Sequence, residues 1–405
     1  MRKGLMAAVL FLFALLVGGD RTALAGYRII HEFDGTDGMA PYGHLISVDG
    51  RLYGMTAGDT IDNKGMVFSL TPDGSDFTLL HHFAGQPRDG EWPHGSLFYH
   101  GHTLYGITWA GGCSQNNCPN WDYTGCGTLL SLRTDGSNYK VFWEFSCGGA
   151  DLSASLPRAH FVSDGKRLYS TAQTGGEFES GAVFAVRPDG TGFSILHSFS
   201  GRDGKEPSGG LALENGILYG TTGFGGENNL GTVFSIRTNG SNFKVLHNFG
   251  GSDGEFSVST PILAYNRIFG ATVYGGVYGQ GVIFSMRPDG ADYRVLHSFT
   301  ENDSGPLEGV ILAGDKLYGT TSSNGPDTFG VIYSLGLDGS QYKVLHRFDY
   351  NDGSWVDGRL LLLGNTLFGL ASHGGRSGNG LVFALDLPPI PPHAYRPKLS
   401  GGRQY

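Results

Sequence analysis

One motif, V-F-S-[LI]-x-P-D-G-S or a close variant of it, recurs seven times along this chain of 405 residues. Each copy follows a strand-like "LYG-x-T" run, and every copy except the last precedes a "VLHxF" run. The copies lie about 50 residues apart, with a longer interval after the first, and centre on Phe68, Leu130, Phe184, Phe234, Phe284, Tyr333 and Phe383. Such a period predicts seven similar structural units that pack on one another.

Each unit contains four strand-like runs separated by glycine-rich turns, which predicts four antiparallel strands per unit. In the second unit we expect these strands over residues 96–99, 104–108, 128–133 and 139–145. An Asp-Gly or Asn-Gly pair, such as Asp73-Gly74, stands between the third and fourth runs of every complete unit and is typical of a tight hairpin. Glycine makes up 68 residues and charged residues only 16%, a composition that favours an all-β fold.

The two ends of the repeat array complement each other. The last unit stops after its third run, whereas the array begins with an isolated fourth run, "YRIIHEF", from Tyr27 to Phe33. An N-terminal strand that completes the last unit would close a ring and remove the free sheet edges. We therefore predict an all-β, seven-bladed β-propeller over residues 26–387, in preference to a β-helix or an open solenoid, which would need polar end caps.

Residues 1–25 have the pattern of a secretory signal peptide. Arg2 and Lys3 precede an apolar run that is too short to span a bilayer, and Ala23-Leu24-Ala25 forms a small-residue cleavage site. An uncleaved anchor is the alternative interpretation. The proline-rich residues 388–405 are expected to form a flexible tail. We expect a secreted or periplasmic monomer without a membrane anchor.

The charge balance argues against one class of partner. The signal segment carries three basic residues and one acidic residue, so its removal changes the formal net charge from −9 to −11. An acidic protein of this kind is not expected to bind nucleic acid.

The strings "LYG-x-T", "GG", "G-x-VFS-x-x-PDGS" and "LHxF" resemble the repeat of the tandem GloVer-repeat proteins, a family with an export signal and a variable C-terminal anchor. The resemblance covers residues 27–387. It implies the repeat architecture and no particular activity. The glycine pairs, such as Gly225-Gly226, are also similar to those of kelch propellers. The tail departs from the family pattern because it contains no apolar anchor segment.

Several recurring residues are interpreted as scaffold. A histidine recurs in the "LHxF" run at His31, His81, His197, His247, His297 and His346. One such histidine per unit cannot converge on a single ligand, so we expect each to make a repeated hydrogen bond between strands or blades. The Asp-Gly pairs that connect the units, such as Asp352-Gly353, fit turn chemistry better than a calcium loop. The sequence therefore predicts no cofactor, and a structural calcium ion is the alternative interpretation of these loops.

Functional residues are sought where the copies disagree. The two positions before each innermost strand should face the central channel at its mouth, and in four neighbouring blades they carry chemically active side chains: Tyr42, His44, His94, Arg158, His160, Asp357 and Arg359. The other three blades offer Ser208 and Gly210, Val258 and Thr260, and Leu307 and Gly309.

Aromatic side chains occur in the loops expected on the same face, at Trp92, Trp109, Trp121, Tyr123, Phe224, Tyr274, Tyr278 and Trp355. Aromatic rings beside imidazoles, arginines and a carboxylate suit a sugar, which stacks its CH faces and hydrogen-bonds its hydroxyl groups. The alternative interpretation is that these rings pack between the blades.

All four cysteines lie in the second unit. In an exported chain they predict two disulfides, and the hairpin geometry favours Cys126 with Cys147 and Cys113 with Cys118. A zinc site is disfavoured because Cys126 and Cys147 do not form a second closely spaced pair, and we predict no metal.

Three classes of function are compatible with this pattern. The leading hypothesis is a secreted module that binds a glycan or another small polar ligand at the channel mouth, because no nucleophile motif or phosphate loop is present. The second is a polysaccharide lyase or hydrolase that uses His44, His94 or His160 as a base and Arg158 or Arg359 to neutralise a carboxylate. The third is a protein-interaction or structural scaffold.

Overall fold

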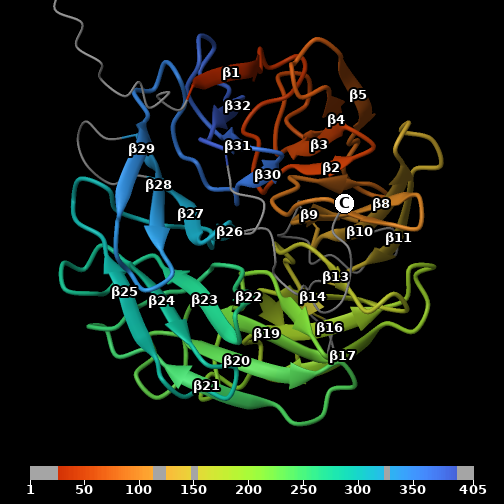
Figure 1. Ribbon diagram of the computed structural model, residues 1–405. Coiled ribbons are helices and arrows are strands. Elements are labelled where there is room, and N and C mark those ends of the chain that lie inside the picture. The colour runs from red at the N-terminus through yellow and green to blue at the C-terminus, as the bar shows by residue number, and fades with distance from the viewer. Residues whose placement is uncertain (1–25, 113–124, 147–153, 323–328, 390–405) are drawn as a thin grey trace, which may run out of the picture.

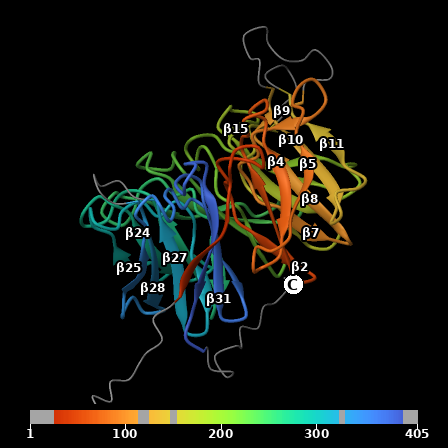
Figure 2. The same cartoon turned by 90° about the horizontal axis from the view of Figure 1, so that it is seen from above.

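The computed structural model describes residues 26–112, 125–146, 154–322 and 329–389. Within these ranges the protein consists of strands and turns without a helix, and its strands form seven four-stranded antiparallel sheets. The sheets are the blades of a seven-bladed β-propeller (Figure 1). Figure 2, turned by 90°, shows the sheets of β4 and β8 on the opposite side of the ring from the sheets of β24 and β28.

The first three blades follow each other along the chain, each with its strands in order from the centre outward. Blade 1 consists of β2 (Ile46–Val48), β3 (Arg51–Thr56), β4 (Met66–Leu70) and β5 (Phe77–His82). Blade 2 consists of β7 (Phe98–His100), β8 (Thr103–Thr108), β10 (Thr128–Arg133) and β11 (Lys140–Glu144). Blade 3 consists of β13 (Val162–Ser163), β14 (Leu168–Ala172), β16 (Ala182–Val186) and β17 (Ser194–Ser198).

The next three blades repeat this order. Blade 4 consists of β18 (Ala212–Glu214), β19 (Ile217–Thr222), β20 (Thr232–Arg237) and β21 (Lys244–Asn248). Blade 5 consists of β22 (Ile262–Ala264), β23 (Arg267–Thr272), β24 (Val282–Met286) and β25 (Arg294–Ser298). Blade 6 consists of β26 (Ile311–Ala313), β27 (Lys316–Thr321), β28 (Val331–Gly336) and β29 (Lys343–Arg347).

Blade 7 is built from both ends of the array. Its three inner strands are β30 (Leu361–Leu363), β31 (Thr366–Ala371) and β32 (Leu381–Asp386), and its outer strand is β1 (Tyr27–Glu32), which pairs antiparallel with β32. The N-terminal strand thus completes the last blade, as its sequence predicts. Two short ladders lie in the loops, β6 (Gly90–Glu91) with β9 (Ala110–Gly111) and β12 (Ala154–Ser155) with β15 (Thr174–Gly175).

The repeat motif is explained by packing inside each blade. The phenylalanine of the third strand lies against the glycine of "YG" on the second strand, and a Cβ at Gly220 would lie only 2.5 Å from Phe234 Cζ. Both Phe234 and its counterpart Phe284 are completely buried. The glycine is required because the ring fills the space of its missing side chain.

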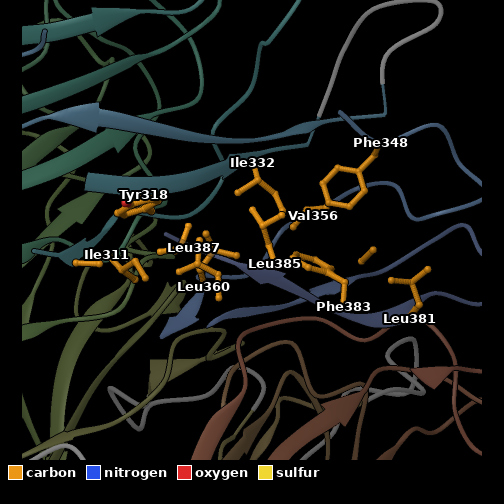
Figure 3. Packing of buried hydrophobic residues seen from close by; sticks show 13 residues of the cluster. Ile311, Tyr318, Ile332, Phe348, Val356, Leu360, Leu381, Phe383, Leu385 and Leu387 are labelled. Carbon is orange, nitrogen blue, oxygen red and sulfur yellow. The ribbon is translucent and has the colours of Figure 1, made fainter. Parts of the chain in front are cut away.

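Hydrophobic side chains fill the space between neighbouring blades. Figure 3 shows Ile332 of blade 6 and Phe348 near Val356, Phe383 and Leu385, which belong to one buried cluster. A separate cluster joins residues of blade 1 to residues of blade 7, namely Leu45, Leu52, Phe68, Phe368, Leu370 and Val382. The first and last blades therefore pack on each other in the same way as consecutive blades.

The recurring histidines connect adjacent blades, as predicted. Five of the six hydrogen-bond the aspartate of the following Asp-Gly pair, with His247 Nε2 2.9 Å from Asp253. Each histidine also stacks on an aromatic ring of the next blade, as His247 does on Tyr293 at 3.8 Å between ring centroids. His297 is the exception to the hydrogen bond, because its Nε2 has no partner among the described residues.

A backbone latch recurs in every blade two residues before the first inward-facing position. The latch residues all have a left-handed φ between 51° and 75°, and they are Ala40, Trp92, Leu156, Glu206, Phe256, Gly305 and Trp355. The carbonyl of each accepts a hydrogen bond from the residue that follows the second strand of its own blade. The N–H of Ala40 donates to Asn379 O of blade 7 at 2.9 Å, so this latch also links the first and last blades.

Candidate functional site

The segment before each innermost strand determines which side chains reach the centre of the ring. The sequence analysis assigns the first and third residues of this segment to inward-facing positions. At the second position, the glycines of four blades lie against the backbone of the next blade, namely Gly43, Gly95, Gly209 and Gly358. A Cβ at Gly43 would lie 2.5 Å from Gly95 O, and a Cβ at Gly95 would lie 2.7 Å from Ala159 O. The second position is therefore restricted to small residues in six of the blades.

The third positions bring two histidines and an arginine together. The rings of His44 and His160 are 4.8 Å apart at their centroids in an edge-to-face arrangement. Burial, together with a smaller contribution from the nearby charge of Arg359, lowers the pKa of His160 to about 3. Burial also lowers the pKa of His44 well below its usual value, with contributions from His160 and Arg359. Both imidazoles are therefore neutral at neutral pH and cannot serve as counterions.

Side-chain contacts set the orientation of these histidines. Ser96 Oγ lies 2.7 Å from His44 Nδ1 and accepts a hydrogen bond from the His44 backbone N–H. His160 lies over Gly210, where a Cβ would be 2.8 Å from His160 Nδ1. Two small residues, Ser96 and Gly210, therefore set the positions of the two histidines.

The residues at the first positions of blades 1, 2 and 3 form a second group together with two tryptophans of the loops. Tyr42 stacks on His94 with 4.7 Å between ring centroids, and burial lowers the pKa of His94 to about 4. The Arg158 guanidinium lies 5.3 Å from the centre of the Trp109 ring, in a cation–π arrangement. Trp92 stacks on Trp109 at 5.9 Å. The expected convergence of blades 1, 2 and 3 is thus present.

The aromatic side chains fit both interpretations that the sequence allows, which are packing between blades and contact with a ligand. Trp92 is a latch residue whose indole N–H donates to Asn63 O at 2.7 Å, and both rings are partly buried between blades. Trp355, the latch residue of blade 7, is 53% exposed. Packing between blades therefore accounts for part of the aromatic set and leaves other rings accessible.

Glu308 is a central residue that the sequence analysis missed. It occupies the second position of blade 6, where the other blades have Gly, Ala or Ser. Its carboxylate accepts hydrogen bonds from the backbone N–H of Gly309 at 3.3 Å and of Thr260 at 3.5 Å. Burial raises the pKa of Glu308 to about 7, although the charge of Arg359 opposes the shift. The exception to the small-residue pattern was the signal that could have revealed it.

Asp357 is the second central carboxyl group. Burial raises its pKa to about 7, a hydrogen bond from Ser372 opposes the shift, and the charge of Glu308 adds to it. The Ser372 Oγ is 3.5 Å away, and the other carboxylate oxygen, Oδ1, has no hydrogen-bond partner among the described residues. The raised pKa therefore keeps part of each of the two carboxyl groups protonated at neutral pH.

Several buried polar atoms around the centre lack partners among the described residues. They are Trp109 Nε1, Arg158 Nε, Asp357 Oδ1 and Arg359 Nε. Buried polar groups are normally hydrogen-bonded, and such exceptions concentrate at functional sites. We call Tyr42, His44, His94, Trp109, Arg158, His160, Glu308, Asp357 and Arg359 the central group.

Other predicted features lie elsewhere or outside the described residues. Phe224, Tyr274 and Tyr278, on the loops of blades 4 and 5, are 38%, 46% and 61% exposed. Trp121 and three of the cysteines, Cys113, Cys118 and Cys147, lie outside the described ranges. Cys126 is buried and carries no free thiol. Its pairing with Cys147 therefore stays a prediction.

Within the described residues, one group has metal-ligand geometry, and it lies away from the centre. Asp59, Asp62 and His82 place potential ligand atoms within 4.8 Å of one another in blade 1. His82 Nε2 is 3.4 Å from an oxygen of each aspartate. The oxygens of Asp59 already accept four backbone N–H groups, so turn chemistry accounts for the cluster. In the connection to blade 7, Asp352 likewise accepts hydrogen bonds from His346 and the Asp349 N–H, the expected turn chemistry.

Comparison with known families identifies the repeat. The model of the Gloeobacter/Verrucomicrobia repeat matches residues 19–118, 122–276 and 262–389. This chain belongs to the Gloeobacter/Verrucomicrobia repeat family. No match was found among curated proteins. Membership in this family establishes the repeat architecture of the chain. The family description itself assigns no activity.

Solved structures share the fold of this repeat-family protein. An oligogalacturonate lyase in complex with manganese is 12% identical, with a TM-score of 0.57, and the match covers 92% of this chain and 95% of that one. An oligogalacturonate lyase from Vibrio parahaemolyticus is 10% identical, with a TM-score of 0.54 and coverage of 90% and 97%. At this identity the likeness shows the propeller fold alone.

The described part of this repeat-family protein contains no helix of the length and hydrophobicity that crossing a membrane requires.

Proposed function

We propose that this protein is a secreted binding module that holds a glycan or another small polar ligand at the centre of its ring. The observation that carries the proposal is the set of unpartnered buried polar atoms on Trp109, Arg158, Asp357 and Arg359. They come from blades 2 and 7, which neighbour blade 1 on either side, and from blade 3, which follows blade 2. A ligand with several hydroxyl groups can satisfy these donors and this acceptor.

The surroundings of these atoms suit a sugar ring. Tyr42, His94 and Trp109 provide aromatic surface beside them, with ring contacts of 4.7 to 5.9 Å linking this surface to Trp92. Aromatic faces stack on the CH groups of a sugar, and neutral imidazoles hydrogen-bond its hydroxyl groups. The neutral state of His94 and His160 supports this assignment, since their lowered pKa values keep them uncharged.

A glycan and polysaccharide screen tests the proposal, with the protein that begins after Ala25. We expect binding by the unmodified protein, and loss of at least tenfold in affinity when His44, His160 and Arg359 are replaced together by glutamine. Tyr265→Ala is the matched control, because Tyr265 is 54% exposed and lies between the first two strands of blade 5, on the other face of the ring. Absence of binding, or unchanged affinity in the triple variant, would disprove the proposed site.

A second candidate function is a polysaccharide lyase or hydrolase at the same site. The observation that favours it is the neutral His160 beside the Arg359 charge, with two carboxyl groups of pKa about 7 nearby. A neutral imidazole can accept a proton, and a protonated carboxyl group can donate one to a leaving oxygen. The lyase activity of the two structural neighbours makes acidic polysaccharides the first substrates to try.

Product analysis distinguishes catalysis from binding. A lyase releases chains with an unsaturated terminal sugar that absorbs ultraviolet light, and a hydrolase releases new reducing ends without that absorbance. Turnover that disappears in His160→Gln would support the enzyme. Binding without either product would leave the binding module as the function.

The remaining expectations are proposals of the same kind. We propose that residues 1–25 are removed on export, that residues 26–387 act as one propeller domain and that 388–405 form a flexible tail. Mass spectrometry of the exported protein would show an N-terminus at Gly26, and size-exclusion chromatography would show a monomer.

A further inference from the structure

Among the described arginines, Arg158 and Arg359 are the two whose Nε is buried without a hydrogen-bond partner. Six other arginines form ion pairs within 4.0 Å, and they are Arg28, Arg51, Arg267, Arg287, Arg294 and Arg376. Among the described residues, neither Arg158 nor Arg359 has such a pair, and the Nε of each is buried without a hydrogen-bond partner. Because a guanidinium stays charged, each is a partly buried cation without an ion-pair partner among the described residues.

The nearby carboxyl groups are engaged or partly neutral. Glu206, whose charge acts on Arg158, lies 3.7 Å from Lys205 Nζ and accepts a hydrogen bond from Gln173 at 3.3 Å. Glu308 accepts backbone hydrogen bonds and, like Asp357, is only partly ionised at neutral pH. The two cations are therefore incompletely balanced by the protein itself.

The unpartnered atoms of the site are mostly donors. Trp109 Nε1, Arg158 Nε and Arg359 Nε can only donate hydrogen bonds, whereas Asp357 Oδ1 is the one unpartnered oxygen of the central group within the described residues. The Tyr42 hydroxyl stays protonated, because burial raises its pKa. An excess of donors around two cations favours an anionic oxygen ligand, and guanidinium groups match the geometry of a carboxylate.

We propose that the ligand carries a carboxylate and that Arg158 and Arg359 bind it, so that the site selects acidic over neutral saccharides. This inference rests on the proposed function, since it concerns the same site. It adds the charge of the ligand and names the two residues that determine specificity. The neutral imidazoles of His44 and His160 beside Arg359 then form hydrogen bonds with hydroxyl groups of the same sugar.

Isothermal titration with a matched pair of probes tests this inference without any variant. The probes are oligosaccharides of a hexuronic acid and the same chains with their carboxyl groups converted to methyl esters. We expect the acid form to bind the unmodified protein at least tenfold more tightly than the ester. Equal affinity for the two forms would overturn the inference while leaving the proposed function in place, and binding of no glycan at all would overturn both.

Arginine variants then assign the selectivity to residues. Arg158→Gln and Arg359→Gln should each reduce the acid-to-ester preference at least fivefold and leave the affinity for the ester almost unchanged. Arg359→Lys keeps the charge and should retain part of the preference. Arg187→Gln is the matched control, because Arg187 is exposed and is not part of the central group. If both glutamine variants kept the full acid-to-ester preference, other groups would have to bind the carboxylate.

Discussion

The imidazole of His160 lies over Gly210, in the space that a side chain at residue 210 would occupy. A Cβ there would also lie 2.6 Å from Thr260 Oγ1, which accepts the Gly210 N–H. Blade 4 thus contributes no reactive group to the site, and its glycine sets the position of a histidine from blade 3.

Gly210→Ala should therefore displace His160 and weaken ligand binding. We expect a loss of about 1–3 kcal/mol in the free energy of unfolding, as is typical of overpacking, together with lower affinity in the glycan titration. Gly250→Ala is the control, because the closest atom to a Cβ at residue 250 is 3.5 Å away. Unchanged ligand affinity in Gly210→Ala would show that the position of His160 does not matter for binding.

The raised pKa of Glu308 makes part of the stability depend on pH. Its pKa is about 7 in the folded protein and 4.5 as a model value, so the folded state binds this proton more tightly. The contribution of Glu308 to the free energy of unfolding is then most favourable below pH 4.5 and declines as the pH rises to 7. Buried neutral histidines, whose pKa is lowered, have the opposite effect below pH 6.5.

Glu308→Gln isolates this contribution, because it keeps the shape and removes the titration. Relative to the unmodified protein, the variant should gain stability between pH 4.5 and 7, up to about 3 kcal/mol if the whole shift is realised. Denaturant melts at several pH values measure the difference. A difference that does not change with pH would contradict the raised pKa.

The latch residues hold a left-handed conformation that is unfavourable for any residue with a side chain. Ala40 has a φ of 51°, whereas blade 6 has Gly305 at the equivalent position. Ala40→Gly should raise the free energy of unfolding by up to about 1 kcal/mol, because relief of strain exceeds the entropy cost of glycine.

Ala212→Gly is the matched control for the latch. Ala212 lies in β18 without a positive φ, so glycine should lower the free energy of unfolding there by about 0.5–1 kcal/mol. Shifts in the same direction at both sites, measured by denaturant unfolding, would mean that the latch is not strained.

Two of the recurring histidines that connect adjacent blades can be compared within one molecule. His247 has both its aspartate hydrogen bond and its stacked ring, whereas His297 has only the stacked ring. His247→Leu should therefore cost about 1–3 kcal/mol more than His297→Leu, the value of a hydrogen bond to a charged group. Equal losses in thermal or denaturant unfolding would assign the stabilisation to stacking alone.

The cysteine pairing gives a chemical prediction. Peptide mapping without reduction should recover a peptide that links Cys126 to Cys147, and a second link between Cys113 and Cys118. In the Cys126→Ser variant only the second link should remain. Recovery of a Cys113 to Cys147 link would show that the hairpin argument chose the wrong pairs.

The architecture was predictable from the sequence because one motif recurs in it at a nearly regular interval. A motif that returns seven times, and an N-terminal run that supplies a missing strand, determine the seven blades and the pairing of β1 with β32. The scaffold role of the histidines followed from the same repetition, since equivalent residues in different blades cannot meet. Comparison of the copies also selected residues that contact one another in the structure, such as His44 and His160.

Only the tertiary structure placed Glu308 in the central group and left Arg158 and Arg359 without ion pairs. The sequence shows a glutamate among small residues, but its environment depends on how far the next blade lies, and that distance arises from packing around the closed ring. The shifted pKa values could not be predicted from the sequence either, because burial depends on contacts between segments that are far apart in the chain. The sequence by itself determined the blades and their inward-facing positions, whereas the charge balance at the centre was decided by the three-dimensional contacts.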